Sequence, residues 1–156
     1  ETVQLAVCDG VDAVYIEKLT MNTLTPVQTR VGARIPLHAT AVGKAILAFS
    51  DPAFVEVMTS IPLARYTDHT ITTKRALLKD LAEIREAGWA YSREEYLLGS
   101  LAIAAPVMVN GKVEAAIGLL NYQLRDDLEV CVPELLDAAA GLGKRLEELQ
   151  ATEQAS

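Results

Sequence analysis

Hydrophobic and polar residues alternate with a period of two near the start of the chain, which is typical of a β-strand with one buried face. Residues 3–19 hold two such runs on either side of Asp9-Gly10. Glycine adopts a positive φ without steric strain, so this dipeptide favours a tight hairpin turn. Residues 24–31 are a further strand candidate, and Pro26 favours the sheet edge because it has no N–H to donate.

Two later runs are almost wholly apolar, and we expect them to be strands that are covered on both faces. They are residues 101–109 and 112–120, joined by Asn110-Gly111, which also favours a hairpin turn. Small side chains on a sheet allow a helix to pack closely, or they leave a cavity for a ligand. The pattern alone does not separate these two interpretations. The small residues of the two runs are Ala102, Ala104, Ala105, Ala115, Ala116 and Gly118.

Apolar residues recur with helical spacing in residues 39–49, where Thr40 is a candidate N-cap. A second helix is expected to begin at Asp51-Pro52, because proline is favoured at the first helical position. Neither segment carries an alternating pattern. We therefore expect two consecutive helices after the first strands.

A third helix is predicted over residues 74–87, with Thr73 as its N-cap and Gly88 as its C-terminal stop. The last 30 residues form a long amphipathic pattern, and Pro133 indicates that this helix begins near Val132. Strands, three helices, further strands and a final helix predict an α+β fold. In such a fold an antiparallel sheet has helices packed on its faces.

The composition is that of one globular domain, with 51% apolar and 22% charged residues in a chain of 156. No apolar run reaches the roughly 18 residues of a membrane span, so we expect a cytoplasmic protein without a membrane partner. The net charge is −7, whereas nucleic-acid-binding surfaces are normally basic, so the chain alone is not expected to bind DNA or RNA. Cys8 and Cys131 are expected to be small buried residues in a reducing compartment.

Gly43-Lys44 is the pair that ends many phosphate-binding loops, but the rest of such a loop is missing. A phosphate-binding loop needs glycine five residues before this pair and serine or threonine after the lysine. This chain has His38 and Ala45 at those positions. We therefore expect no nucleotide at this segment.

The sequence shows no recognisable catalytic or metal-binding set. His38 lacks a neighbouring nucleophile and is expected to hydrogen-bond the backbone, while His69 is expected in a surface loop. The two histidines are not part of an HxxxH or CxxC motif, so they form no recognisable zinc set. Glu94 and Glu95 would point to opposite faces of a strand, so one is expected to be buried and hydrogen-bonded, without joint acid–base work. We expect no catalytic residue, no metal and no cofactor.

Three motifs, in order along the chain, resemble those of a known family. ETVQLAVCDGVDAVYIEKL at residues 1–19 looks like its opening hairpin, and GARIPLHATAVGKAILA at residues 32–48 is similar to the motif that opens its helical part. Its C-terminal signature is matched, at the expected spacing, by Gly88, Ser92, Glu95, Ala102, Ile103 and Ala104, followed by Ala105-Pro106-Val107. The family is that of the IclR transcriptional regulators, and the matching part is their effector-binding domain.

The resemblance implies a GAF-like fold, with residues 1–150 as a ligand-sensing domain and residues 151–156 as a frayed tail. It implies that a winged helix-turn-helix domain lies upstream, and that DNA is bound only through that domain. It also implies a small-molecule effector, a small organic acid or an aromatic catabolic metabolite. A homodimer or tetramer would then couple effector binding to DNA affinity.

By position, the resemblance implies that the effector pocket is formed by strand residues and by the start of the helix at residues 39–49. That helix would offer its first N–H groups to an anion. Gly43 is expected to permit close packing of the helix on the sheet. Lys44 is expected to snorkel or to pair with an acid at the surface rather than to bind the effector. The implied pocket residues are Leu24, Ile35, Ala41, Val42, Ser92, Ala102, Gly118 and Leu120.

Several of these positions depart from the family pattern. The family often has Asp at Ser92, Cys at Ala102 and small hydroxyl residues at Gly118 and Leu120. These changes remove polar anchors and add apolar surface, which adds about 25 cal/mol per Å² buried. We therefore expect a larger or more apolar effector, such as an aromatic acid, rather than a two- or three-carbon keto acid.

Two other functions remain open at this point. One is an enzyme on a GAF-like fold, such as a thiol-dependent reductase, which would need paired cysteines in the pocket. The other is a stand-alone metabolite sensor without a DNA-binding domain. Cys8 in a predicted strand and Cys131 near a helix start do not indicate such a pair.

Overall fold

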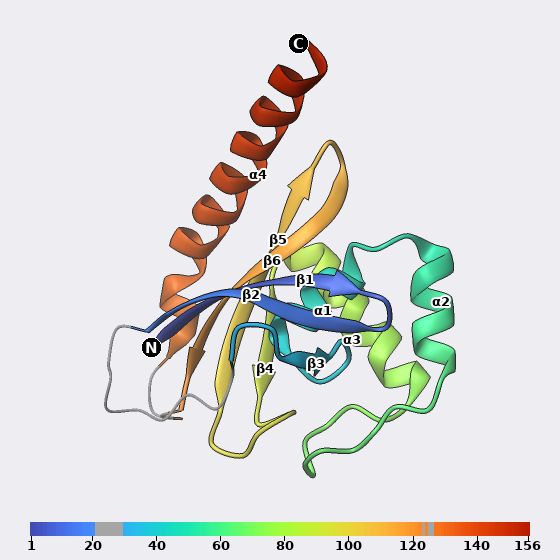
Figure 1. The fold of residues 1–156 in the computed structure, drawn as a ribbon. Coiled ribbons are helices and arrows are strands. Elements are labelled where there is room, and N and C mark those ends of the chain that lie inside the picture. Colours follow the sequence, from blue (N-terminus) through green and yellow to red (C-terminus); the bar gives the residue numbers. More distant parts are fainter. Residues whose placement is uncertain (21–29, 123, 125–126) are drawn as a thin grey trace.

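Six strands form one antiparallel sheet in the order β3-β2-β1-β6-β5-β4 (Figure 1). The computed structural model describes residues 1–20, 30–122, 124 and 127–156. Within these residues the hairpin at each predicted turn is present, as β1–β2 and β5–β6. The strands are β1 (Thr2–Asp9), β2 (Asp12–Thr20), β3 (Arg34–Pro36), β4 (Ala90–Arg93), β5 (Leu101–Val109) and β6 (Lys112–Asn121).

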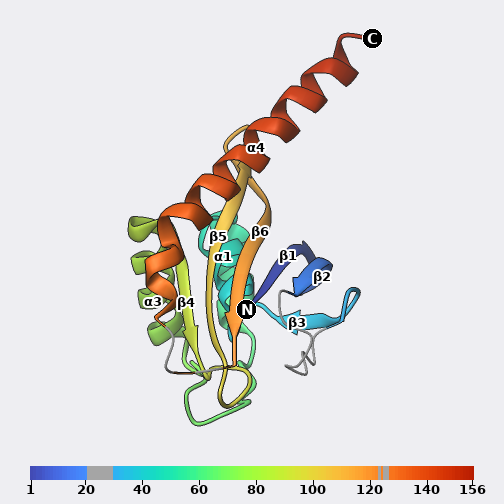
Figure 2. The same cartoon turned by 90° about the vertical axis from the view of Figure 1, so that its left-hand side faces the viewer.

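Helices cover both faces of the sheet (Figure 2). On one face α1 (Ala41–Ala48) packs against β1, β5 and β6, α3 (Lys74–Ala87) packs on α1, and α2 (Pro52–Ser60) packs on α3. On the other face α4 (Val132–Gln154) follows a short 3-10 turn and packs against β5 and β6. Its C-terminal end extends beyond the sheet (Figures 1 and 2). The predicted α+β arrangement is confirmed.

Local capping chemistry sets the helix ends where the sequence predicted them. Thr40 accepts a hydrogen bond from the N–H of Gly43, and Thr73 accepts one from the N–H of Ala76. Gly88 ends α3 in the left-handed region, with a φ of 86°, which glycine adopts without strain. The predicted helix over residues 74–87 is therefore confirmed.

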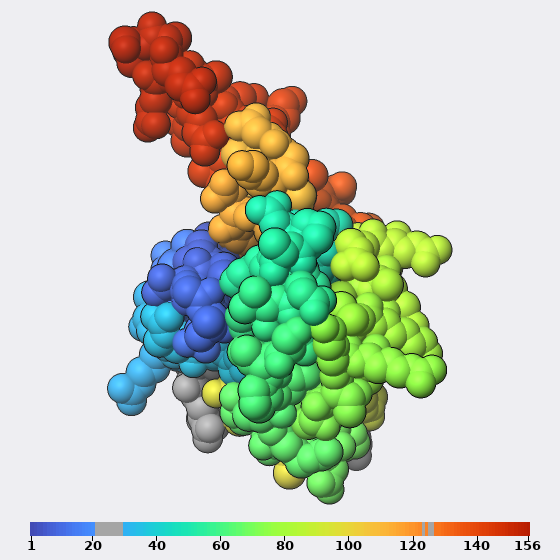
Figure 3. Space-filling view, turned by 90° about the vertical axis from the view of Figure 1, so that its right-hand side faces the viewer, coloured from blue at the N-terminus to red at the C-terminus, as the bar shows by residue number. Residues whose placement is uncertain are grey.

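Side chains of different size face the two sides of β5. Ala102 and Ala104 face α1, whereas Leu101, Ile103 and Val107 belong to the apolar core under α4. Because α1 is itself wholly buried, α2 and α3 form the outer surface on that side (Figure 3). The predicted burial of this strand on both faces is confirmed.

The observed edge strand differs from the predicted one. Most of the predicted strand at residues 24–31 lies outside the described residues, and Arg30 and Val31 belong to no strand. The edge is instead β3, where Ile35 pairs with Ala13. This short strand is followed directly by the loop that leads into α1, so its sequence pattern was too brief to predict.

Three further expectations need revision or stay open. Cys8 is exposed at the end of β1 and Cys131 is half-buried, so the prediction of two buried cysteines is wrong. Glu94 and Glu95 lie in a loop, because β4 ends at Arg93. The helix α4 extends to Gln154, and fraying of residues 151–156 stays a prediction. Within the described ranges, no helix is both long enough and apolar enough to span a bilayer.

Candidate functional site

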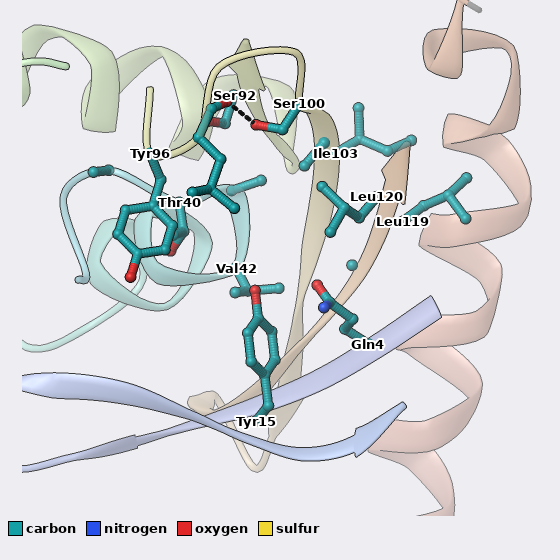
Figure 4. A pocket seen from close by; sticks show the side chains of 15 residues that line it. Gln4, Tyr15, Thr40, Val42, Ser92, Tyr96, Ser100, Ile103, Leu119 and Leu120 are labelled. Carbon is teal, nitrogen blue, oxygen red and sulfur yellow. Dashed lines mark hydrogen bonds between the residues drawn. The ribbon is translucent and has the colours of Figure 1, made fainter. Parts of the chain in front are cut away.

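A hollow lies between the N-terminus of α1 and the inner face of the sheet (Figure 4). The space between its side chains, counted together with the open solvent at its mouth, measures about 430 Å³. None of the lining residues is charged. They are Gln4, Tyr15, Ala39, Thr40, Ala41, Val42, Ser92, Tyr96, Leu97, Ser100, Ala102, Ile103, Gly118, Leu119 and Leu120.

The register of the sheet brings distant residues together in the wall of this hollow. Ser92 on β4 pairs with Ala102 on β5, which pairs with Leu120 on β6. One row further along the sheet, Gly118 on β6 pairs with Gln4 on β1. Because side chains two residues apart on a strand share a face, Leu120 and Gly118 both face the hollow.

The first turn of α1 presents unpaired backbone donors to the hollow. The hydroxyl of Thr40 donates to the carbonyl of Pro36 over 2.9 Å and accepts from the N–H of Gly43 over 3.1 Å. Among the hydrogen bonds of the described residues, none uses the N–H of Ala41 or Val42. Free N–H groups and the helix dipole together make this end of a helix favourable for an anion.

Neutral polar groups lie elsewhere in the wall. Ser92 is buried, and no hydrogen bond of its hydroxyl is present in the described part of the chain. Tyr15 points from β2 toward Val42 (Figure 4). Its hydroxyl interacts with the side chain of Gln4. Burial raises the pKa of Tyr15 far above its ordinary value, so its phenol remains protonated and can donate to a ligand. The hollow therefore combines one anion-binding end with uncharged hydrogen-bonding groups.

A loop between β4 and β5 closes one side of the hollow with Tyr96, Leu97 and Ser100. Glu94 fixes both ends of this loop: its N–H donates to the carbonyl of Ser100, and its Oε1 accepts from the N–H of Gly99. The hydroxyl of Ser100 also donates to the carbonyl of Leu97. These bonds hold the loop in one shape, so its lining side chains are preorganised.

Two glycines set how closely α1 approaches its neighbours. A Cβ on Gly118 would lie 2.7 Å from Cγ1 of Val42, so this glycine permits the helix to approach the sheet. A Cβ on Gly43 would lie 2.6 Å from Cα of Leu37 and 2.6 Å from Oγ1 of Thr40. Gly43 therefore permits contact with the loop before α1, and the prediction that it serves helix-to-sheet packing is wrong.

Six of the eight predicted pocket residues line the hollow. Leu24 lies outside the described residues, and Ile35, on β3, is buried in the core rather than in the wall. That these residues bind an effector stays a prediction. The six that the fold brings together are Ala41, Val42, Ser92, Ala102, Gly118 and Leu120.

Sequence reasoning missed several polar lining residues: Gln4, Tyr15, Tyr96 and Ser100. Gln4 and Tyr15 lie in the buried phase of the alternating pattern of β1 and β2. The apolar residues of that pattern, such as Val3, Leu5 and Val14, lie on the opposite, less buried face, so the pattern offered no signal for Gln4 and Tyr15. Tyr96 and Ser100 lie in a loop, where no periodicity indicates which side chains turn inward.

The two other residues of interest in the α1 segment have structural partners. Nε2 of His38 lies 2.8 Å from the carbonyl oxygen of Ala64, which confirms the expected backbone bond. Nζ of Lys44 pairs with carboxylates of Asp80 and Glu95. The side chain of Lys44 is only 1% exposed, so the pairing is confirmed, but the prediction of a surface position is wrong.

Neither cysteine lies in the hollow, and both are free. Burial is the main cause that raises the pKa of the Cys8 and Cys131 thiols, which disfavours the reactive thiolate. Within the described residues, no group of three or more His, Cys, Asp or Glu side chains is placed to hold a metal ion. The geometry thus gives no support to thiol chemistry at the hollow.

Comparison with known proteins identifies related domains along most of the chain. The family model for the C-terminal domain of the bacterial transcriptional regulator IclR matches residues 1–142. The Pca operon regulatory protein of Acinetobacter baylyi is 35% identical over 136 residues, covering 83% of this chain and 49% of that protein. The chain spans about half the length of the curated relatives it matches.

Two solved structures share the fold and contain bound aromatic acids. An IclR homologue from Microbacterium hydrocarbonoxydans, complexed with 4-hydroxybenzoate, is 30% identical with a TM-score of 0.88, covering 95% of this chain and 61% of that one. A double mutant of the PobR inducer-binding domain from Acinetobacter, complexed with 3-hydroxybenzoic acid, is 28% identical. Its TM-score is 0.79, and the match covers 95% of this chain and 88% of that one.

Proposed function

The chain belongs to the IclR family of bacterial transcriptional regulators as a C-terminal, effector-binding domain, and we propose that its effector is an aromatic carboxylic acid bound in the hollow beside α1. The observation that carries this proposal is the pair of unpaired N–H groups at Ala41 and Val42 beside an uncharged, largely apolar hollow. A carboxylate supplies the negative charge that these N–H donors favour, and an aromatic ring supplies apolar surface to contact the apolar wall.

The carboxylate would lie at the N-terminus of α1, near the hydroxyl of Thr40. The ring would then lie beside Val42, against the part of the wall that Ala102 and Leu120 form. Ser92 and the Tyr15–Gln4 pair offer hydrogen bonds to a ring hydroxyl. No carboxylate or ammonium side chain lines the hollow, so the helix terminus is the sole charge-complementary feature among the described lining groups.

A two- or three-carbon keto acid would use the same anion-binding end but leave the apolar wall in contact with water. Burial of apolar area contributes about 25 cal/mol per Å², so an aromatic ring gains affinity that a small keto acid cannot. The hydroxybenzoates bound by the two structural relatives support this class of effector. The replacement of the family's usual polar anchors at Ser92 and Ala102 favours it as well.

Effector binding would act on DNA through a domain outside this chain. A ligand shifts a population of conformations only by its differential affinity for them, so the bound and free domains must differ in a contact with a neighbouring domain or subunit. We propose that this contact is made in a homodimer or tetramer, and that the N-terminal domain supplies the DNA contacts. This chain spans about half the length of its relatives, two of which are named a transcriptional regulator and a transcriptional repressor, and this supports a further domain that contacts DNA.

A thermal-shift screen tests the effector class directly. The chain would be heated with hydroxybenzoates, with benzoate, and with glyoxylate and pyruvate. A ligand at 100 times its Kd stabilises the folded state by about 2.7 kcal/mol, which raises the melting temperature by several degrees. We expect such a rise with aromatic acids. A rise confined to glyoxylate or pyruvate would contradict the aromatic assignment, and no rise with any acid would contradict the binding site itself.

A further inference from the structure

The ammonium of Lys44 lies at the junction of three segments, two of which form the wall of the hollow. It donates to Oδ2 of Asp80 over 2.8 Å, to the carbonyl oxygen of Tyr91 over 2.8 Å and to Oε1 of Glu95 over 2.9 Å. An ammonium has three protons, so all of them are used by these three acceptors. The cation is thus fully satisfied inside the protein, without a ligand.

Each bond to the wall falls one residue before a residue that lines the hollow. Tyr91 precedes Ser92 on β4, and Glu95 precedes Tyr96 in the loop between β4 and β5. Lys44 itself lies two residues after Val42 in α1, and its N–H donates to the carbonyl of Thr40. One side chain therefore connects the helix that presents the anion-binding N–H groups to the strand and the loop opposite.

Glu95 is held at this junction although its environment disfavours the charge. Its side chain is 11% exposed, and its Oε2 has no hydrogen-bond partner in the part of the chain that the structure describes. Burial raises the pKa of Glu95, and the attraction of Lys44 opposes this only in part. Replacing a buried pair of this kind by apolar residues is often neutral or stabilising, so the pair is poorly explained by stability alone. A role in fixing geometry accounts for its presence.

The loop has a second attachment at the same residue. The hydroxyl of Thr70 donates to the carbonyl of Glu95 over 2.6 Å, and the hydroxyl of Thr67 donates to the carbonyl of Glu94. These bonds fix the backbone against the segment before α3. The bond from Lys44 to Glu95 fixes the loop against α1. This bond therefore sets the distance between Tyr96 and the N-terminus of α1.

We propose that Lys44 and Glu95 are positioning residues for effector binding: their buried ion pair holds the Ser92 and Tyr96 wall at a fixed distance from the N-terminus of α1. The proposal rests on the proposed function, because it assigns a role to residues that touch no effector. Lys44 acts on the site through the wall, and its own ammonium is already occupied.

Asp80 provides a matched control. It contacts the same ammonium at nearly the same distance as Glu95, but it lies on α3, which contributes no residue to the hollow. Asp80→Asn and Glu95→Gln each remove one negative charge from Lys44 while keeping the size of the side chain. A merely structural role predicts similar effects of both substitutions, whereas a positioning role predicts a difference at the hollow.

The test compares the two variants by calorimetric titration with 4-hydroxybenzoate. If loss of the Glu95 charge leaves the wall correctly placed in only about a tenth of the molecules, the apparent Kd rises about tenfold. We expect that rise in Glu95→Gln, a change of less than about twofold in Asp80→Asn, and closely similar melting temperatures. Equal changes in Kd, or changes in Kd that follow the melting temperature, would overturn the proposal.

A second measurement makes the test independent of the effector. Backbone amide exchange, measured without ligand, should accelerate across residues 92–100 in Glu95→Gln and remain at the wild-type rate there in Asp80→Asn. Unchanged exchange in Glu95→Gln would overturn the positioning role. If wild-type protein bound no aromatic acid, the proposed function would fail, and the exchange comparison would still decide the role of the pair.

Discussion

The two faces of the sheet are packed by helices of opposite character. On one face α4 lies over large apolar side chains such as Leu101, Ile103 and Val107, and an open hollow remains beside its first turns, next to β1 and β6. On the other face α1 lies over Ala102 and Gly118, leaves a hollow at its N-terminus and buries a cation in its interior. The same two strands, β5 and β6, form both contacts.

The difference follows from which residues alternate along each strand. Large side chains on one face fill the space to a helix, as close packing in protein interiors requires. Small side chains on the other face let the short α1 approach, but they fill less of the space beyond its end. We therefore expect the α4 side of the sheet to contribute mainly to stability and the α1 side to ligand binding. Substitutions on the α4 side should change the free energy of unfolding without changing the Kd.

The largest effect is expected from Lys44→Met, which removes the buried cation of the α1 face. It leaves the carboxylates of Asp80 and Glu95 without their partner, and breaking a buried pair in this way costs roughly 3–5 kcal/mol. Urea denaturation measures the loss in the free energy of unfolding. Lys74→Met, which removes an exposed ammonium on α3, serves as the control and should change stability little. Equal losses in both variants would mean that the burial of Lys44 adds nothing to the free energy of unfolding.

The next effect is expected on the α4 face. A Cβ on Gly143 would lie 2.3 Å from the carbonyl oxygen of Met108, so Gly143→Ala must push α4 away from β5 at a cost of about 1–3 kcal/mol. Gly141 on the same helix has no atom within 4 Å of such a Cβ. Gly141→Ala should therefore stabilise the protein, by about 0.5–1 kcal/mol.

The Gly143→Ala variant also tests the separation of the two faces. Its Kd for 4-hydroxybenzoate should equal that of wild type at a temperature where both are folded. A weaker affinity in proportion to the lost stability would show that the faces are not independent.

A smaller effect, on binding, is expected from Gly118→Ala. The added methyl group would meet Cγ1 of Val42, whose β-branched side chain has little rotamer freedom to move aside. We expect the wall of the hollow to shift and the Kd for 4-hydroxybenzoate to rise about tenfold, which is about 1.4 kcal/mol. Calorimetric titration measures this rise. Unchanged affinity would place the effector away from the contact between β6 and α1.

The smallest effect is expected from Ser92→Ala. The substitution removes a buried hydroxyl that has no hydrogen bond among the described residues, so the free protein should lose little stability. A bond from this hydroxyl to the effector would be worth about 0.5–1.5 kcal/mol of binding free energy. Ser60→Ala on the outer surface of α2 is the matched control. Equal affinity in wild type and Ser92→Ala would remove Ser92 from the site.

Local chemistry made much of the fold predictable. Thr73, Gly88 and Asn110-Gly111 act within a few residues of themselves, so the boundaries they predicted are those of α3 and of the β5–β6 turn. The alternating pattern does not predict burial at the end of a strand. Cys8 is exposed because it lies in the last, uncovered residues of β1.

The site was less predictable, because it depends on contacts between distant segments. From the sequence, Lys44 is expected to be exposed. It is buried because α3 and β4, which are distant in the sequence, supply its hydrogen-bond acceptors. Gly43 was assigned to the sheet, although the atoms that exclude a side chain there belong to Leu37 and Thr40. Tyr15 lines the hollow because the pairing of β2 in the sheet places its side chain there. Local spacing carries no information on such approaches.

An aromatic carboxylate bound at the N-terminus of α1 should be visible at the backbone N–H groups of that helix. The most direct measurement is the change in backbone amide resonances of the isotope-labelled chain when 4-hydroxybenzoate is added. We expect saturable shifts of the Ala41 and Val42 amides, together with those of residues 92–100, and unchanged resonances along residues 135–149 of α4. Shifts centred on α4, or none at Ala41 and Val42 while the ligand binds, would contradict binding at the N-terminus of α1.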